Sequence, residues 1–430
     1  MNTQMALCPE IDIKRYSNAN ANKVDGDDKA FHNWYRFILS FPPHLVREYI
    51  QKFDLKKGDA VLDPFCGTGT TVLESKLNGL IGIGIEANPV AHFASLVKTD
   101  FDIDGDKLLD DSVQVAKKAA RLIERYSSKE LITLSPEKYS LLLTDSISPI
   151  PLHKTLILLN SIREFDSEYI NNQLLALATS TVKFASNLRF GPEVGVSRIK
   201  KKDAEVVQNW IETVKIMVGD LKSVHAQTYL PSKLIYGDSR DLGEYLEHNS
   251  IDAVFTSPPY PNEKDYTRTT RLESVILDFI KNKSELKDLK KTLLRSNSRN
   301  VYKGDDDDKY ILHHQEIIRI ANEIENRRIA LKKTSGFEKL YHKVTKLYFG
   351  GMAKHLEKLK PFLKKNALLG YVVGDQASYL QVYIPTGKIL ADIANKLGYD
   401  VVGIDLFRTR FATATKKDMN EEVLVLRWRG

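Results

Sequence analysis

Residues 59–86 read DAVLDPFCGTGTTVLESKLNGLIGIGIE, and this stretch decides the fold. Its apolar start, residues 59–65, predicts a short buried strand that runs into a glycine-rich turn. Residues 70–79 predict a helix that ends at a glycine, and residues 80–86 predict a second strand that ends in an acidic residue. This order of elements opens a doubly wound α/β sheet.

Five further strand patterns follow, at residues 233–238, 251–257, 368–375, 399–407 and 421–428. The last two lie too close together for a crossover helix, so we expect them to pair antiparallel. The sequence therefore predicts an α/β protein with a Rossmann-like sheet of about seven strands, mostly parallel with an antiparallel end pair.

Two long segments lack strand patterns. Residues 106–232 and 270–345 show helical periodicity, and the second segment is also highly charged. We expect both to be helical insertions in one domain formed by residues 31–105 and 233–430. Residues 1–30 are polar, and we expect them to form an irregular N-terminal arm.

The composition limits the compartment and the partners. The 430 residues carry a formal net charge of +7, which permits a nucleic-acid partner without requiring one. There are two cysteines, Cys8 and Cys66, which argues against a disulfide-rich secreted protein and against a zinc site. The sequence shows no secretory signal and no apolar run long enough for a bilayer, so we expect a cytoplasmic protein that binds no membrane.

Four consecutive aspartates occupy positions 305–308. Adjacent carboxylates on one loop rarely converge on a single ion, so we expect a solvated loop and no metal site.

The turn after the first strand, DPFCGTGTT at residues 63–71, contains glycines that permit a tight turn and a close approach of the backbone to a ligand. It lacks the third glycine of a phosphate-binding fingerprint and the lysine of a P-loop. Glu86 ends the second strand, where an acidic side chain commonly binds a ribose diol. Each feature alone also fits a structural role, as a tight strand-to-helix turn or as a helix N-cap.

A second motif, TSPPY at residues 256–260, follows a predicted strand. Its prolines fix an extended backbone and donate no N–H, which leaves carbonyl groups free to accept from a ligand amine beside an aromatic ring. Such a pair often only stiffens the end of a strand. Here it should lie at the same carboxyl edge as the glycine turn and Glu86, where open α/β sheets bind ligands.

Together these motifs resemble the amino-methylating DNA methyltransferases, which modify cytosine N4 or adenine N6. The resemblance rests on DPFCGTGTT, GIEANP, YGDSR and TSPPY, on the FPP of residues 41–43, and on the ending RTRFATATKKDMNEEVLVLRW. It covers roughly 200 of the 430 residues. It implies S-adenosylmethionine (SAM) as the methyl donor and double-stranded DNA as the substrate, and it makes the insertions candidates for target recognition.

The resemblance also implies roles for individual residues. It implies that Phe65, Gly67 and Gly69 form the loop around the methionine part of SAM and that Asp63 lies beside its ammonium group. It further implies that Glu86 binds the ribose and that the Asp238 carboxylate lies near the adenine amine. The implied catalytic loop is Ser257, Pro258, Pro259 and Tyr260.

The chemistry of the target suggests how that loop would work. The Ser257 hydroxyl and the Pro258 carbonyl can accept the two N–H groups of a base amine, which localises the nitrogen lone pair. Tyr260 would stack on the base, which must flip out of the duplex to reach it. The sequence shows no Pro-Cys pair of the kind used for methylation at cytosine C5, which disfavours that reaction.

Several functions stay open at this level. Serine at the first catalytic position favours cytosine N4 over adenine N6 within the family, in a restriction–modification or similar defence system with a cognate endonuclease. An RNA base-amine methyltransferase can share the PPY-type loop. A non-catalytic nucleic-acid-binding subunit would have lost the glycines or the PPY residues, and both are intact.

Basic residues in two places are candidates for a phosphate track: Arg198, Lys200, Lys201 and Lys202 in the first insertion, and Lys264 and Arg268 after the catalytic loop. The alternative for the first group is a solvated surface.

Overall fold

The computed structural model describes residues 21, 23–36, 40–125, 131–191, 193–262, 264–412 and 415–430. Cys8 and most of the arm predicted for residues 1–30 lie outside this part of the chain. Among the described residues, no helix is both long enough and apolar enough to cross a membrane.

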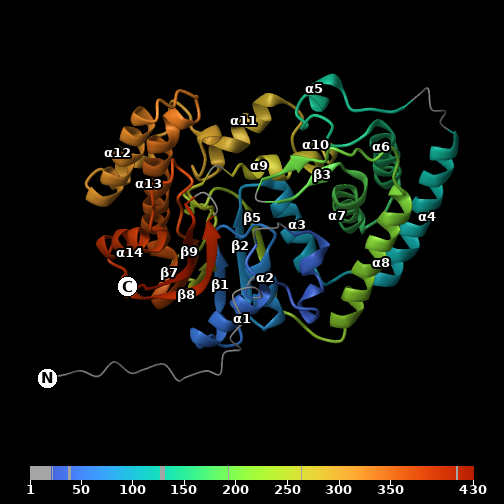
Figure 1. Ribbon diagram of the computed structural model, residues 1–430. Coiled ribbons are helices and arrows are strands. Elements are labelled where there is room, and N and C mark those ends of the chain that lie inside the picture. Colours follow the sequence, from blue (N-terminus) through green and yellow to red (C-terminus); the bar gives the residue numbers. More distant parts are fainter. Residues whose placement is uncertain are drawn as a thin grey trace.

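One seven-stranded sheet forms the centre of the molecule (Figure 1). Its strand order is β5-β2-β1-β6-β7-β9-β8. The first five strands in this order are parallel, whereas β9 runs antiparallel to both β7 and β8. The predicted Rossmann-like sheet with an antiparallel end pair is confirmed. The strands are β1 Ala60–Asp63, β2 Ile81–Glu86, β5 Lys233–Tyr236, β6 Ile251–Thr256, β7 Leu363–Gly374, β8 Asp400–Ala412 and β9 Lys417–Arg427.

The central strands are covered on both faces, which explains their continuous apolar sequences. All four residues of β1 are buried. At Gly82 in β2, a Cβ atom would lie 2.6 Å from the carbonyl oxygen of Val72, so only glycine lets α2 approach this closely. The sequence of β2 thereby fixes the helix that follows the glycine turn against the sheet.

Helices form a layer on each side of the sheet. The helices α1, α2 and α3 lie on one side, and α13 and α14 pack with α12 on the other. These helices are α1 Pro43–Lys52, α2 Thr70–Leu77, α3 Pro89–Thr99, α12 Gln315–Ala330, α13 Tyr341–Leu359 and α14 Thr386–Lys396.

The first insertion is a helical lobe, seen on the right of Figure 1. Its apolar core is continuous with α3, so the lobe is joined to the sheet layer by buried side chains. Trp210 is fully buried there, and its indole N–H donates to the carbonyl oxygen of Gln173 at 2.9 Å. The lobe contains α4 Gly105–Arg125, α5 Pro136–Tyr139, α6 Pro149–Arg163, α7 Ile170–Ser180, α8 Val206–Val224 and a small hairpin of β3 Leu188–Arg189 and β4 Gly195–Val196.

The second, charged insertion follows α9 Tyr266–Thr269. It begins with α10 Arg271–Ile276 and α11 Lys283–Thr292 and continues through α12. The prediction of a solvated loop at residues 305–308 is wrong for two of the four aspartates. Asp305 pairs with buried Arg295 at 2.8 Å, and Asp307 is 6% exposed and pairs with Arg240 at 2.6 Å. These carboxylates hold the loop against the body of the protein.

Candidate active site at the carboxyl edge of the sheet

A cleft of about 560 Å³ opens where β1, β2 and β6 end. Its walls include residues 64–68 of the glycine turn, residues 86–88 after β2 and residues 257–260 after β6. We call residues 257–260 the catalytic loop, after the role that the sequence predicts for them. Segments far apart in the sequence therefore meet at one edge, as the strand order requires for parallel neighbours.

The glycine turn depends on left-handed backbone conformations. Gly67 has φ of +52° and Gly69 has φ of +83°, values that side chains disfavour. A Cβ atom at Gly69 would also lie 2.9 Å from the Ser95 hydroxyl oxygen. Gly67 and Phe65 line the cleft, whereas Gly69 lies behind the wall as the N-cap of α2.

Glu86 is fixed in the wall of the cleft by two backbone groups. One carboxylate oxygen accepts from the N–H of Gly67 at 2.8 Å, and the other accepts from the N–H of Asn88 at 2.7 Å. Burial raises the pKa of Glu86 to about 7. Each oxygen keeps a second lone pair, so the ionised side chain can accept two further hydrogen bonds, as a ribose diol would require.

Asp63 lies behind the glycine turn and does not line the cleft. It is fully buried, and one of its oxygens accepts from the Thr256 hydroxyl at 2.5 Å and from the N–H of Phe65 at 3.1 Å. The other oxygen has no hydrogen-bond partner within the described chain, and burial raises the pKa of Asp63 to about 6. The side chain joins β1 to the catalytic strand β6, and its contact with an ammonium group stays a prediction.

The buried side chain of Lys98 binds the backbone of the glycine turn. It is 1% exposed, and its ammonium group donates to the carbonyl oxygens of Thr68 at 2.6 Å and Tyr35 at 3.2 Å. Burial lowers the pKa of Lys98 to about 7. The hydroxyl of Tyr35 donates in turn to Glu273 in α10, so a chain of buried polar contacts runs from the turn to the second insertion.

Asp238 is held away from the cleft by an arginine. The Arg240 guanidinium binds its carboxylate at 2.6 Å and also binds Asp307 at 2.6 Å. Arg240 is 6% exposed, and these two carboxylates raise its pKa although burial opposes them. The flanking residues Gly237 and Ser239 line the cleft, and a contact of Asp238 with an adenine amine stays a prediction.

The donors and acceptors around the turn fit SAM. Gly67 has no side chain to obstruct a ligand, Phe65 offers an aromatic face, and each Glu86 oxygen keeps a lone pair. These residues would hold the methionine part and the ribose of the methyl donor.

The catalytic loop forms another part of the wall of the cleft. The Ser257 hydroxyl donates to the carbonyl oxygen of Val372 in β7 at 3.1 Å, and no donor among the described residues reaches the carbonyl oxygen of Pro258. Tyr260 packs on the end of β7, since a Cβ atom at Gly374 would lie 3.0 Å from its ring. Burial and then the charge of Glu421 raise the pKa of Tyr260.

Sequence analysis missed two contributors to the cleft. The second insertion supplies residues 292–294, Ser296 and Asn300, and the β8–β9 hairpin supplies Arg408, Arg410 and Glu421. The predicted strand at residues 399–407 stops just before the arginines, whereas β8 continues to Ala412. The alternation of Arg-Thr-Arg after a strand was the available signal that both arginines share one side of it.

The basic candidates fall in different places. Lys264 lines the cleft, whereas Arg268, in α9, and residues 198–202 do not. The latter form a loop after β4, in which Lys200 pairs with Asp145 at 3.5 Å and Lys201 donates to the carbonyl oxygen of Phe184 at 2.9 Å. Arg198 and Lys202 are exposed, and their role stays a prediction.

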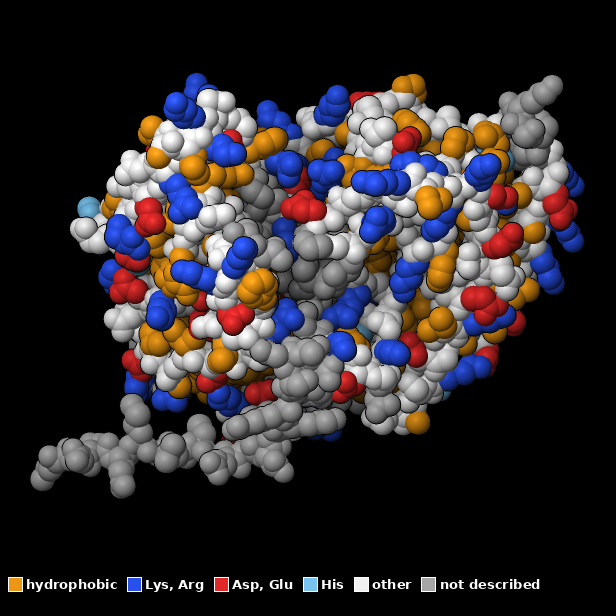
Figure 2. Space-filling model, viewed as in Figure 1, with side chains coloured by type: hydrophobic (Ala, Val, Ile, Leu, Met, Phe, Trp, Pro, Cys, Tyr) orange, Lys and Arg blue, Asp and Glu red, His pale blue; other side chains and the backbone are white. Residues whose placement is uncertain are grey.

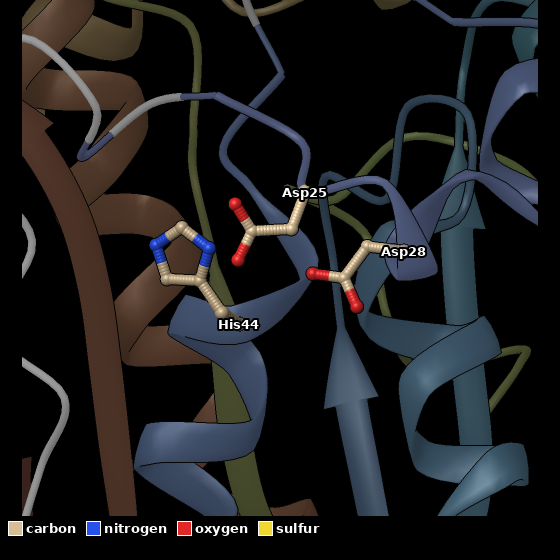
Figure 3. Close-up of side chains that lie close together, drawn as sticks. All are labelled: Asp25, Asp28 and His44. Atoms are coloured by element: carbon tan, nitrogen blue, oxygen red, sulfur yellow. The ribbon is translucent and has the colours of Figure 1, made fainter.

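Asp25, Asp28 and His44 lie close together beside α1, with one ligand atom from each within 4.8 Å of the others (Figure 3). Arg47 binds both oxygens of Asp28 at 2.8 Å and also reaches Glu74 at 3.0 Å. Because Arg47 already supplies a cation, we interpret the cluster as a contact that fixes this segment on α1.

Comparison with known proteins agrees with the geometry. Residues 12–95 match a family model described as DNA methylase. The chain is similar to the DNA methylases of this family over that segment and to Type II methyltransferases over longer stretches.

Three relatives show how far the similarity extends. The Type II methyltransferase M.BsoBI of Geobacillus stearothermophilus is 30% identical over 300 residues, which are 61% of this chain and 59% of that protein. The Type II methyltransferase M.AvaI of Anabaena variabilis is 25% identical over 411 residues, 87% of this chain and 80% of that protein. A tRNA (guanine(10)-N2)-dimethyltransferase of Methanocaldococcus jannaschii is 33% identical over 103 residues, 24% of this chain and 27% of that protein.

Proposed function

We propose that the protein transfers a methyl group from SAM to an exocyclic amine of a base in double-stranded DNA, and that the amine is cytosine N4. One observation carries the proposal: the glycine turn with Glu86 and the catalytic loop line the same cleft. A donor held by the first and a base held by the second would share that space.

The hydrogen bonds of the catalytic loop support this chemistry. The Ser257 hydroxyl donates to the Val372 carbonyl, so its oxygen keeps a lone pair that can accept from a base amine. The Pro258 carbonyl can accept the second N–H, and Tyr260 can stack on the ring. Withdrawing both N–H groups from the base plane localises the nitrogen lone pair, and the sulfonium of bound SAM supplies the methyl group.

The relatives support a place in a restriction–modification system. Two of them are named Type II methyltransferases, and the match to M.AvaI extends over 80% of that protein. We therefore propose that the protein has a cognate restriction endonuclease as partner. Its substrate would then be chromosomal DNA, and it would act in the cytoplasm. Serine at position 257 favours cytosine N4 over adenine N6. The tRNA methyltransferase makes methylation of an RNA base amine the second candidate, although that similarity covers only 27% of the relative.

Sequencing DNA from an expressing host by a method that distinguishes N4-methylcytosine from N6-methyladenine tests the base and the target site together. We expect N4-methylcytosine at one recurrent sequence. N6-methyladenine in its place would overturn the choice of base, and methylated RNA with unmethylated DNA would overturn the substrate.

Single-turnover methylation at saturating SAM tests the catalytic loop. Ser257→Ala should slow transfer by about 100-fold, because an oriented acceptor for the amine is lost. Pro258→Ala keeps its carbonyl and should have a smaller effect, while SAM affinity should be largely retained in both. A normal single-turnover rate in folded Ser257→Ala protein would refute this role.

A further inference from the structure

Three cationic side chains line the catalytic half of the cleft. Lys264 follows the catalytic loop by four residues, and Arg408 and Arg410 project from β8. None of them belongs to the motifs that would hold SAM, which follow β1, β2 and β5.

The two arginines are held in place by a single carboxylate. Arg408 binds one oxygen of Glu421 at 2.5 Å, and Nε of Arg410 lies 3.5 Å from the other oxygen. A second nitrogen of Arg410 donates to the carbonyl oxygen of Asp375 at 2.8 Å. Glu421 is 8% exposed, so it orients both guanidinium groups but neutralises only one charge.

Lys264 adds a third positive charge, and the charges of Glu193 and Glu421 act on it without forming an ion pair. Within the described chain, no carboxylate forms an ion pair with it. Burial lowers the pKa of Lys264, and the charge of Arg410 lowers it further. The three cations outnumber the carboxylates of Glu421 and Glu193, so this part of the cleft keeps a net positive charge that favours binding of an anion.

We propose that Lys264, Arg408 and Arg410 bind a backbone phosphate of the strand that carries the target base, next to the flipped nucleotide. This inference rests on the proposed DNA substrate. Guanidinium groups match the oxygen geometry of a phosphodiester, and contacts to the backbone set the register of a protein on DNA. On the face drawn in Figure 2, Lys and Arg side chains, in blue, lie near the middle of the molecule between the two lobes.

The SAM carboxylate is the other anion that could enter the cleft, so the experiment measures both ligands. Lys264→Gln and Arg410→Gln are compared with Lys365→Gln, a matched control at the amino-terminal end of β7, away from the cleft. Fluorescence anisotropy with a labelled duplex and S-adenosylhomocysteine gives DNA affinity over a range of salt concentrations. Calorimetry gives SAM affinity without DNA.

We expect each cleft variant to bind DNA about tenfold more weakly and to lower the slope of log affinity against log salt by about 1. SAM affinity should be unchanged, and the control should behave as wild type. Lys264→Gln should also melt no lower than wild type, because it removes repulsion and breaks no ion pair.

Two results would overturn the inference: unchanged DNA affinity and slope in both cleft variants, or SAM affinity that falls as much as DNA affinity. If the wild-type protein binds no DNA, the proposed function fails. If the wild type binds DNA and the variants bind it equally well, only the phosphate site fails.

Discussion

Replacing Glu86 by glutamine would keep the shape of this side chain and remove its charge. In the wild type, each oxygen accepts from one backbone N–H, of Gly67 at 2.8 Å and of Asn88 at 2.7 Å. A glutamine amide must direct its NH₂ group at one of these donors, so it loses a backbone contact and one acceptor for the ribose. Charge-assisted hydrogen bonds are worth about 1.5–3 kcal/mol each. We therefore expect Glu86→Gln to weaken SAM binding by about 10- to 100-fold.

The pH dependence gives a second signature. Burial raises the pKa of Glu86 to about 7, so the side chain is largely protonated at pH 6 in the free protein. Because ribose hydroxyls donate to the ionised form, binding SAM below pH 7 should release a proton. Affinity should then fall by up to about tenfold for each pH unit below 7.

Isothermal titration calorimetry in two buffers of different ionisation enthalpy measures both effects at pH 6.5. Wild-type protein should release a proton on binding, and Glu86→Gln should release less. Glu48→Gln, which alters a carboxyl group on α1, is the matched control. Wild-type affinity and proton release in folded Glu86→Gln protein would refute the ribose assignment.

Two further changes test parts of the molecule outside the cleft. Lys98→Met should weaken SAM binding at pH 7 by about tenfold, because the Thr68 carbonyl loses its donor. In the wild type, the lowered pKa of Lys98 should make the free energy of unfolding rise between about pH 7 and pH 10.5, because the unfolded chain there holds a proton that the folded chain has released. Urea unfolding across this range should show that the variant loses this rise. The same pH profile in the variant and the wild type would contradict the lowered pKa of Lys98. Reversing the charges of Arg198 and Lys202 together should lower the salt slope of DNA binding by about 2, with Lys365→Gln as control; an unchanged slope would make this loop an ordinary surface.

The sheet could be predicted because its strands are short apolar runs between turn residues. The errors arose where contacts come from distant segments. Asp305 and Asp307 look solvated in sequence, but their partners Arg295 and Arg240 reach them only in the folded chain. The arginines of β8 were missed because the strand extends beyond its apolar part.

In the candidate site too, features of the local sequence could be predicted, whereas contacts between distant segments could not. The place of Glu86 and Ser257 at the cleft could be predicted because each lies at or just after the end of a recognisable strand. Asp238 was assigned to the donor from its motif, yet its carboxylate is bound by Arg240 two residues later, a choice that depends on Asp307 in the second insertion. Spacing alone cannot show such a competition between partners.

The buried Arg240 bridge has a consequence for building hybrid enzymes. It ties the second insertion to the end of β5, and residues 292–294 of that insertion form part of the cleft wall. Transplanting residues 270–345 from a relative would therefore exchange part of the cleft together with whatever sequence preference the segment carries. A graft of the first lobe would instead have to match the apolar face of α3. Chimeras made to change the recognised DNA sequence should begin with that lobe, and any graft of the second segment should keep the arginine and both of its acidic partners.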